Sequence, residues 1–271
     1  MKSYRLTRLR SLLLALLAVF AFGVVAAAAA QAEETAPYWT VPKSEGSSET
    51  KRLREGETRF ITAKTYNATT LTGLGVTVTC PTVELKEGVL LGSETREPGK
   101  DDAIVEFKGG CTQTGNGTSC TVVEPITTVP VKSELVENVE GAAAGKKLLT
   151  EFFPATGARF ATVKFTGTCT VTSEIAVEGK VAAEVRTDPN APPGIGEAVE
   201  LPNRGKTATS WLLNFPGTPI KEVWLVTAGT GKAAKVGLAV GSEPLTFAGA
   251  VLVLLANSKR ETREETWSPL P

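Results

Sequence analysis

Apolar and polar residues alternate through the middle of the chain, most clearly between Ala161 and Val185. Every second position there is apolar, cysteine, glycine or serine, and the positions between are mostly Thr, Lys and Glu. A period of two places successive side chains on opposite faces of a β-strand. Because the stretch exceeds an ordinary strand in length, we expect a turn or bend between Gly167 and Glu174, giving one hairpin or a strongly bent pair of strands.

Shorter stretches with the same period lie on both sides of this one. Together with a short apolar run, they predict strands at 76–80, 103–111, 120–122, 211–215, 223–226 and 236–240. Residues 248–256 carry no polar side chain, which is typical of a fully buried strand, although periodicity alone leaves a helix as the alternative. The sequence therefore predicts an all-β fold, a disulfide-tied antiparallel β-sandwich or barrel spanning about residues 58–267.

The first 32 residues have the three parts of a secretory signal peptide. Four basic residues precede an apolar run at 12–30, and Ala30-Gln31-Ala32 stands directly before Glu33. This order predicts export by the general secretion route, with cleavage between Ala32 and Glu33. An uncleaved membrane anchor is the alternative, because the apolar run is nearly long enough to span a bilayer. Contact with the membrane is expected to be transient, through the signal peptide.

The segment after the cleavage point differs in composition from the rest. Residues 33–57 are rich in Glu, Ser, Thr, Lys, Gly and Pro, with little apolar content beyond Tyr38 and Trp39. Such a composition predicts a flexible lead-in. The alternative is that Tyr38 and Trp39 dock onto the body as an anchor.

A second compositional break divides the remaining chain. Residues 58–188 contain all four cysteines and form the predicted disulfide-bearing β domain. Between residues 188 and 202 the chain has four prolines and two glycines, which marks a long surface loop or a domain boundary. Residues 189–271 are therefore expected to be a β extension or a second lobe packed on the first.

Each of the four cysteines shares the parity of the apolar residues in its own strand pattern. We therefore expect all four to face inward and to form two disulfides, as suits an exported protein. A zinc site is the weaker alternative, because structural zinc sites use closely spaced pairs such as Cys-x-x-Cys.

One of the three possible cysteine pairings has a geometric argument. The segment Thr114-Gly115-Asn116-Gly117 is a strong turn signal. A hairpin around it would set Cys111 directly opposite Cys120 and leave Cys80 to pair with Cys169. The alternative joins Cys80 to Cys111 and Cys120 to Cys169.

Histidine is absent from the whole chain. Its absence excludes Ser-His-Asp and Cys-His nucleophile arrangements and histidine-ligated metals. We expect no catalytic residue, no cofactor and no metal site. Removal of residues 1–32 would take four of the 29 basic residues and none of the 29 acidic ones, leaving a net charge of −4. This balance, with no block of one sign, predicts no nucleic-acid partner.

Carboxylates are the acid–base groups that remain. Asp101-Asp102 and Glu264-Glu265 are adjacent pairs, and neighbours on a strand point to opposite faces. We interpret them as solvated charges beside turns, since glycoside hydrolysis needs two carboxylates that face each other across a cleft.

A resemblance covers about half of the exported chain. Within residues 71–185, a strand ends in Cys80, Val105-Glu-Phe-Lys-Gly-Gly-Cys111 follows, and Phe165-Thr-Gly-Thr-Cys169 comes before Val177-Glu-Gly179. This arrangement resembles a group of exported, cysteine-containing β-rich proteins of unknown function from soil actinobacteria. The resemblance implies compartment and fold class and carries over no functional residue.

These features predict a secreted or envelope-associated, non-enzymatic protein that acts as a binding or structural module. An envelope glycan or another exported protein is its expected partner. The alternative is a carbohydrate-binding or carboxylate-dependent carbohydrate-active protein. For that function Trp39 and Trp267, near the termini, are the better candidates for exposed sugar-stacking platforms.

Overall fold

The computed structural model describes residues 36–44, 49–94, 97–138, 147–187, 210–216, 223–227, 230–234, 236–257 and 268–270. The described residues contain strands and no helix, so the predicted all-β class is confirmed. The predicted signal peptide, the cleavage point between Ala32 and Glu33, the proline-rich segment, Glu264-Glu265 and Trp267 lie outside the described residues.

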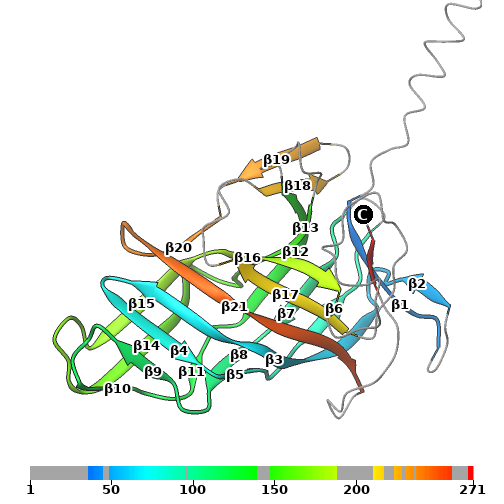
Figure 1. Ribbon diagram of the computed structural model, residues 1–271. Coiled ribbons are helices and arrows are strands. Elements are labelled where there is room, and N and C mark those ends of the chain that lie inside the picture. The colour runs from blue at the N-terminus through cyan, green and yellow to red at the C-terminus, as the bar shows by residue number, and fades with distance from the viewer. Residues whose placement is uncertain are drawn as a thin grey trace, which may run out of the picture. The chain divides into compact units, whose positions relative to one another are not determined.

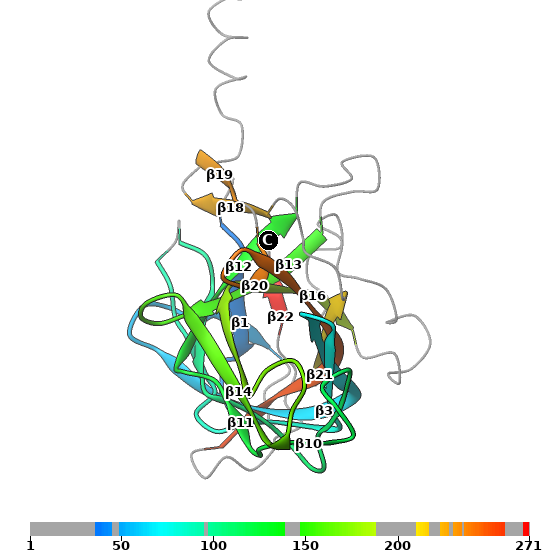
Figure 2. The ribbon, with the colours of Figure 1, turned by 90° about the vertical axis from the view of Figure 1, so that its left-hand side faces the viewer.

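Eight antiparallel strands close into a barrel (Figures 1 and 2). Around the ring they are β3 (Thr58–Gly73), β6 (Val89–Leu91), β7 (Lys100–Ala103), β12 (Val131–Asn138), β13 (Lys147–Pro154), β16 (Val181–Thr187), β17 (Ser210–Pro216) and β21 (Glu243–Ala256). Because β21 pairs with β17 on one edge and with β3 on the other, the ring is closed. The predicted strand at 248–256 is thus confirmed.

β3 and β21 are 16 and 14 residues long and continue past the barrel. At their far ends the same sheet continues in six further strands, which we call the second sheet. On the β3 side lie β4 (Val76–Cys80) and β9 (Thr112–Thr114), and on the β21 side lie β20 (Leu238–Val240), β15 (Glu174–Gly179), β14 (Arg159–Thr168) and β10 (Ser119–Val122). The register of the long pair shifts around Gly249. A Cβ on Gly249 would lie 2.8–3.0 Å from atoms of Thr69 and Ala68, so glycine permits the close approach at this irregularity.

A small sheet completes the wall between these two regions. It consists of β5 (Thr82–Leu85), β8 (Val105–Lys108) and β11 (Ile126–Thr127). On one side the Val83 amide donates to Thr65 Oγ1 of β3 at 2.7 Å. On the other side a bridge joins Thr128 to Ala161 of β14. The predicted single strand at 103–111 is therefore divided between the barrel and this sheet.

Two buried apolar clusters fill the interior. Leu135, Val185 and Leu255 belong to the cluster inside the barrel, and Val78 and Val163 belong to the cluster under the second sheet. Four partly buried residues pack against both clusters, namely Leu85, Val105, Phe107 and Phe152. The interior is therefore continuous from one end of this body to the other.

The central alternating stretch forms the hairpin that its pattern predicts. β14 and β15 pair antiparallel, with Val163 opposite Ile175. Their inward residues are buried, as the alternation requires. After this hairpin the chain passes into the barrel wall as β16, which pairs with β13 and β17.

A three-stranded sheet covers the other end of the barrel (Figure 2). It consists of β1 (Tyr38–Pro42), β2 (Thr50–Arg52) and β22 (Ser268–Leu270). Trp39 is 4% exposed, and Leu53 donates its amide hydrogen to the Trp39 carbonyl. Gly99 lies so close that a Cβ there would be 2.9 Å from Trp39 Cδ1. The remaining hairpin, β18 (Val223–Thr227) with β19 (Thr230–Ala234), pairs with the end of β12.

The sheet of β1, β2 and β22 contradicts two predictions made from the sequence. For 36–44 and 49–57 the flexible lead-in is wrong, and the alternative of an anchor is what the structure contains. The physical reason is that the barrel end exposes an apolar core, and burying Trp39 and Val41 against it offsets the entropy lost on ordering the segment. For the same reason Trp39 is not an exposed sugar-stacking platform.

The chain after residue 188 also differs from its prediction. β17 and β21 are barrel strands that pair with β16 and β3, respectively. Within 189–271 the described strands β17 and β21 therefore complete the barrel, and for them the predicted extension or second lobe is wrong. The proline- and glycine-rich composition between residues 188 and 202 indicates a long connection. It does not indicate which strands before and after that connection pair with each other.

The disulfides join Cys80 to Cys111 and Cys120 to Cys169. The preferred pairing, Cys111–Cys120 with Cys80–Cys169, is wrong, and the alternative is correct. Cys80 and Cys120 are buried, whereas Cys111 and Cys169 are half-buried. The expected number of two disulfides is therefore confirmed, and the expected inward position holds fully for Cys80 and Cys120.

The error arose from the turn at 114–117, which does not connect paired strands. β9 pairs with β4, and β10 pairs with β14, so the two strands flanking the turn belong to different edges. Asn116 is fully buried and fixes this junction: its Oδ1 accepts hydrogen bonds from the amides of Val171 and Thr172, at 2.8 and 3.0 Å. The β4–β9 pairing therefore brings Cys80 next to Cys111, and the β10–β14 pairing brings Cys120 next to Cys169.

Peptide mapping of the unreduced protein tests this pairing. We expect linked peptides containing Cys80 with Cys111 and Cys120 with Cys169; a peptide linking Cys111 to Cys120 would contradict the structure.

In the chain-entropy treatment, loops with separations of 31 and 49 residues each contribute about 4 kcal/mol to the free energy of unfolding. Replacing either pair by alanine should therefore lower the free energy of unfolding in urea by about that amount.

Candidate functional site

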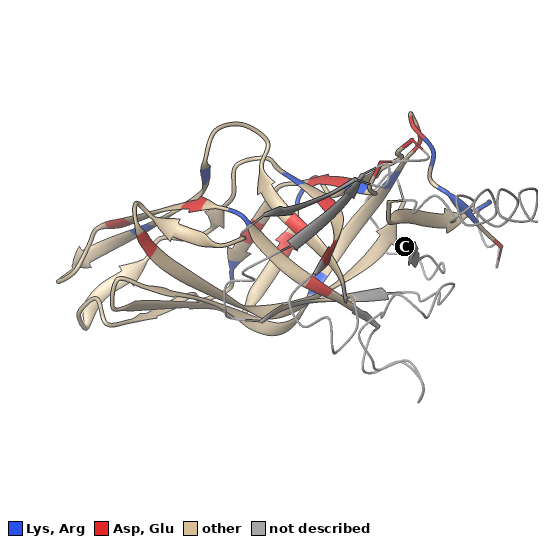
Figure 3. Cartoon of the chain, turned by 90° about the horizontal axis from the view of Figure 1, so that it is seen from above, with Lys and Arg blue, Asp and Glu red and all other residues tan. Residues whose placement is uncertain are grey.

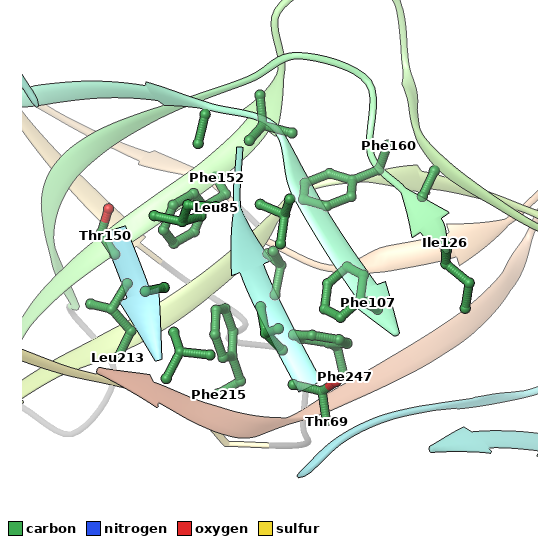
Figure 4. A pocket seen from close by; sticks show the side chains of 18 of the residues that line it. Thr69, Leu85, Phe107, Ile126, Thr150, Phe152, Phe160, Leu213, Phe215 and Phe247 are labelled. Atoms are coloured by element: carbon green, nitrogen blue, oxygen red, sulfur yellow. The ribbon is translucent and has the colours of Figure 1, made fainter. Parts of the chain in front are cut away.

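A cavity of about 120 Å³ lies in the interior and is lined by residues of both apolar clusters. Figure 4 shows side chains converging on it from strands that are far apart in sequence. They include Phe160 of β14, Leu213 of β17 and Thr69 of β3. The cavity thus depends on the closed wall as a whole and not on any single loop.

The apolar character of the lining follows from the alternation along each strand. Ala63 of β3 and Val253 of β21 are cross-strand partners, and both point inward. Three inward positions are alanine, at Ala63, Ala103 and Ala161. A short side chain at these positions leaves space that a leucine or phenylalanine would occupy.

Four phenylalanines form a connected group along the cavity (Figure 4). The ring centroids of Phe107 and Phe247 are 5.7 Å apart, and those of Phe247 and Phe215 are 4.9 Å apart, both edge to face. The centroid of Phe152 lies 6.2 Å from that of Phe215. These are favourable aromatic geometries, so the rings give the cavity a rigid wall where the two clusters meet.

A short chain of polar side chains interrupts this apolar lining. Ser133 of β12 is the cross-strand neighbour of Asp101 of β7, and its hydroxyl donates to Asp101 Oδ2. Thr150 of β13 donates to Ser133 Oγ at 3.0 Å. All three residues are buried, and Asp101 and Thr150 line the cavity.

Asp101 is the only ionisable side chain among the described residues that line the cavity. It is 5% exposed. Burial raises the pKa of its carboxyl to about 7; the hydrogen bond from Ser133 opposes this rise and the neighbouring charge of Asp102 adds to it. The carboxyl therefore changes its charge near neutral pH.

The charged groups on the outside of the barrel belong to a different surface. Acidic and basic residues lie side by side there (Figure 3). Lys180 Nζ is 3.2 Å from a Glu151 carboxylate oxygen and 5.2 Å from the centre of the Phe153 ring. Burial raises the pKa of Glu134, while Lys100 lowers it. These groups stand at positions that alternate with the inward ones and do not line the cavity.

The position of Asp101 corrects the interpretation of Asp101-Asp102 as solvated charges. Asp101 lies inside the barrel, while Asp102 is half-buried. Asp101 stands two residues before the inward-facing Ala103 on the same strand. This shared parity was the sequence signal that Asp101 faces the interior. A carboxylate at an inward position is normally a reason to assign the strand to the surface, because burying a charge is costly.

Paired-carboxylate hydrolysis has no counterpart in this cavity, because the described lining contains one carboxyl group. Among the residues that the structure describes, no three His, Cys, Asp or Glu side chains lie close enough together to hold a metal ion. The same residues contain no helix with the length and apolar character to cross a membrane. What the site offers is an apolar volume with one acidic group in its wall.

The pH dependence of stability tests the buried state of Asp101. Its pKa is about 7 in the folded protein and about 4 in an unfolded chain. The unfolded state therefore loses this proton first, and stability decreases as pH rises from about 4 to about 7. An asparagine at position 101 does not ionise, so the Asp101→Asn variant does not lose this stability. Between pH 4 and pH 7 the difference in free energy of unfolding between variant and wild type should therefore change by about 4 kcal/mol in favour of the variant.

Urea unfolding of both proteins at several pH values measures this gain. The exposed Glu174→Gln substitution is the matched control and should show little relative change. Curves for Asp101→Asn and wild type that run parallel from pH 4 to 8 would contradict a buried Asp101.

Comparisons of the chain with protein-family models, with curated proteins and with solved structures found no match.

Proposed function

We propose that this protein is an exported, non-enzymatic binding protein that holds a small apolar ligand inside its barrel. The observation that carries the proposal is the cavity of about 120 Å³ with its almost wholly apolar lining. Ligand sites in proteins are concave and mostly apolar, with a few placed polar groups. The arrangement around Asp101 and Thr150 fits this description.

The size of the cavity limits the ligand. An engineered apolar cavity of about 150 Å³ in another protein stays dry and binds benzene or xenon. A cavity slightly smaller than that suits one small ring or a short alkyl chain. Transfer of such a group from water into the cavity is favourable, because it removes apolar surface from water without breaking protein contacts.

Separate observations support the proposed export of the protein and its proposed preference for an apolar ligand. Two disulfides are typical of proteins that mature in an oxidising environment, which supports export, as do the signal-peptide pattern and the resemblance to exported actinobacterial proteins. A sugar would lose hydrogen bonds to water in this lining. With Trp39 buried as well, the carbohydrate-binding alternative draws no support from the cavity.

Methyl NMR with benzene as probe tests the proposal. We expect the methyl signals of Val163 and Val253, which line the cavity, to shift on addition of benzene. The signal of Val171, which is 50% exposed, should not move. If the lining methyl signals stay in place at saturating benzene, the proposed function is wrong.

A cavity-filling variant provides the matched comparison. Ala103→Leu places a larger side chain in the lining and should reduce benzene binding below detection, because it takes up the free volume. Ala176→Leu adds the same atoms on a half-buried residue of β15 outside the lining and should leave binding unchanged. Equal binding by both variants would place the benzene elsewhere.

A further inference from the structure

The hydrogen-bond chain in the cavity wall has a direction. Thr150 donates to Ser133, and Ser133 donates to Asp101 Oδ2. Each hydroxyl has one proton, so both protons are committed within the chain. A carboxylate has no proton to donate. The two members of this hydrogen-bond chain that line the cavity, the Asp101 carboxylate and the Thr150 oxygen, therefore offer a ligand only acceptors.

The negative charge of the Asp101 carboxylate has no positively charged side chain beside it among the described residues that line the cavity. Among the described residues, the Asp101 carboxyl receives one side-chain hydrogen bond, from Ser133, and no positively charged side chain lines the cavity. Its neighbours across the adjacent strands, Leu90 and Ser133, are uncharged. A buried carboxylate without a cation is costly, and a cation beside it recovers much of that cost.

We propose that the ligand is a small apolar amine whose ammonium group binds Asp101 and Thr150 while its hydrocarbon part fills the apolar cavity. This inference rests on the proposed function, which requires only that something apolar binds. An ammonium group has three donors and a positive charge, and it therefore matches both the acceptors and the unpaired charge. A primary alcohol matches the acceptors alone.

The same wall binds ligands with other head groups more weakly or not at all. A ligand carboxylate would meet the Asp101 carboxylate and the Thr150 oxygen with acceptors of its own, and like charges at short range repel. A hydrocarbon without a polar group would fit the volume and leave the acceptors without a donor. The expected order of affinity above pH 7 is amine, then alcohol, then alkane, with the carboxylate not bound.

Four compounds of one chain length test this order. Pentylamine, 1-pentanol, pentane and pentanoate are added to the full exported chain at about pH 8 in sealed calorimeter cells, and the rise in unfolding temperature is converted to affinity. Pentylamine should bind about tenfold or more tightly than pentane, as a hydrogen bond to a charged group is worth more than about 1.4 kcal/mol. Pentanoate should produce no rise.

Asp101→Asn is the decisive variant. It keeps an acceptor for Ser133 and removes the charge, so the preference for pentylamine over pentane should fall at least about tenfold, while pentane binding is retained. Glu174→Gln, which neutralises an exposed carboxylate, should keep the preference.

The outcomes separate this inference from the proposed function. If pentane and pentanol bind and pentylamine binds no better, the amine inference is wrong and an apolar binding protein remains. If the amine preference persists in Asp101→Asn, the ammonium group binds elsewhere and the inference is again wrong. If none of the four compounds raises the unfolding temperature, both proposals fail.

Discussion

The antiparallel pairing of β3 with β21 is the contact on which the rest of this structure depends. One part of the pair closes the eight-stranded barrel, and the other part carries the second sheet. Residues near the beginning of the body thereby meet residues near its end. Loss of this pairing would open the barrel wall and expose the cluster that contains Leu255 and Ile61. Such long-range pairing is slow to form because it closes a long loop, and the two disulfides shorten the search within the second sheet alone.

Local patterning was sufficient to predict most of the strands. The alternation between Ala161 and Val185 gave the hairpin, and the apolar run at 248–256 gave a strand, because period and composition are properties of neighbouring residues. The choice of strand partners depends on residues far away in sequence. For this reason neither the closure of β21 on β3 nor the correct cysteine pairing followed from the sequence. The turn at 114–117 was real, but its flanking strands pair with other strands.

The candidate site was harder to predict than the fold. Cavity volume arises from inward alanines such as Ala63 and Ala103 that come together only in three dimensions. Asp101 violates the expectation that carboxylates face water, and the structure tolerates it through the hydroxyl groups of Ser133 and Thr150. Departures of this kind from local rules are where function is expected, because they cost stability that selection for folding alone would not retain.

The proposed binding function requires that the barrel interior is a dry apolar cavity that admits a small apolar molecule. A crystal structure of the protein under xenon gas tests this requirement, since xenon enters apolar cavities and scatters strongly. We expect xenon density between the ring of Phe107 and the side chain of Thr150, both of which line the cavity. Side chains that fill this space, or ordered water in place of xenon, would contradict it.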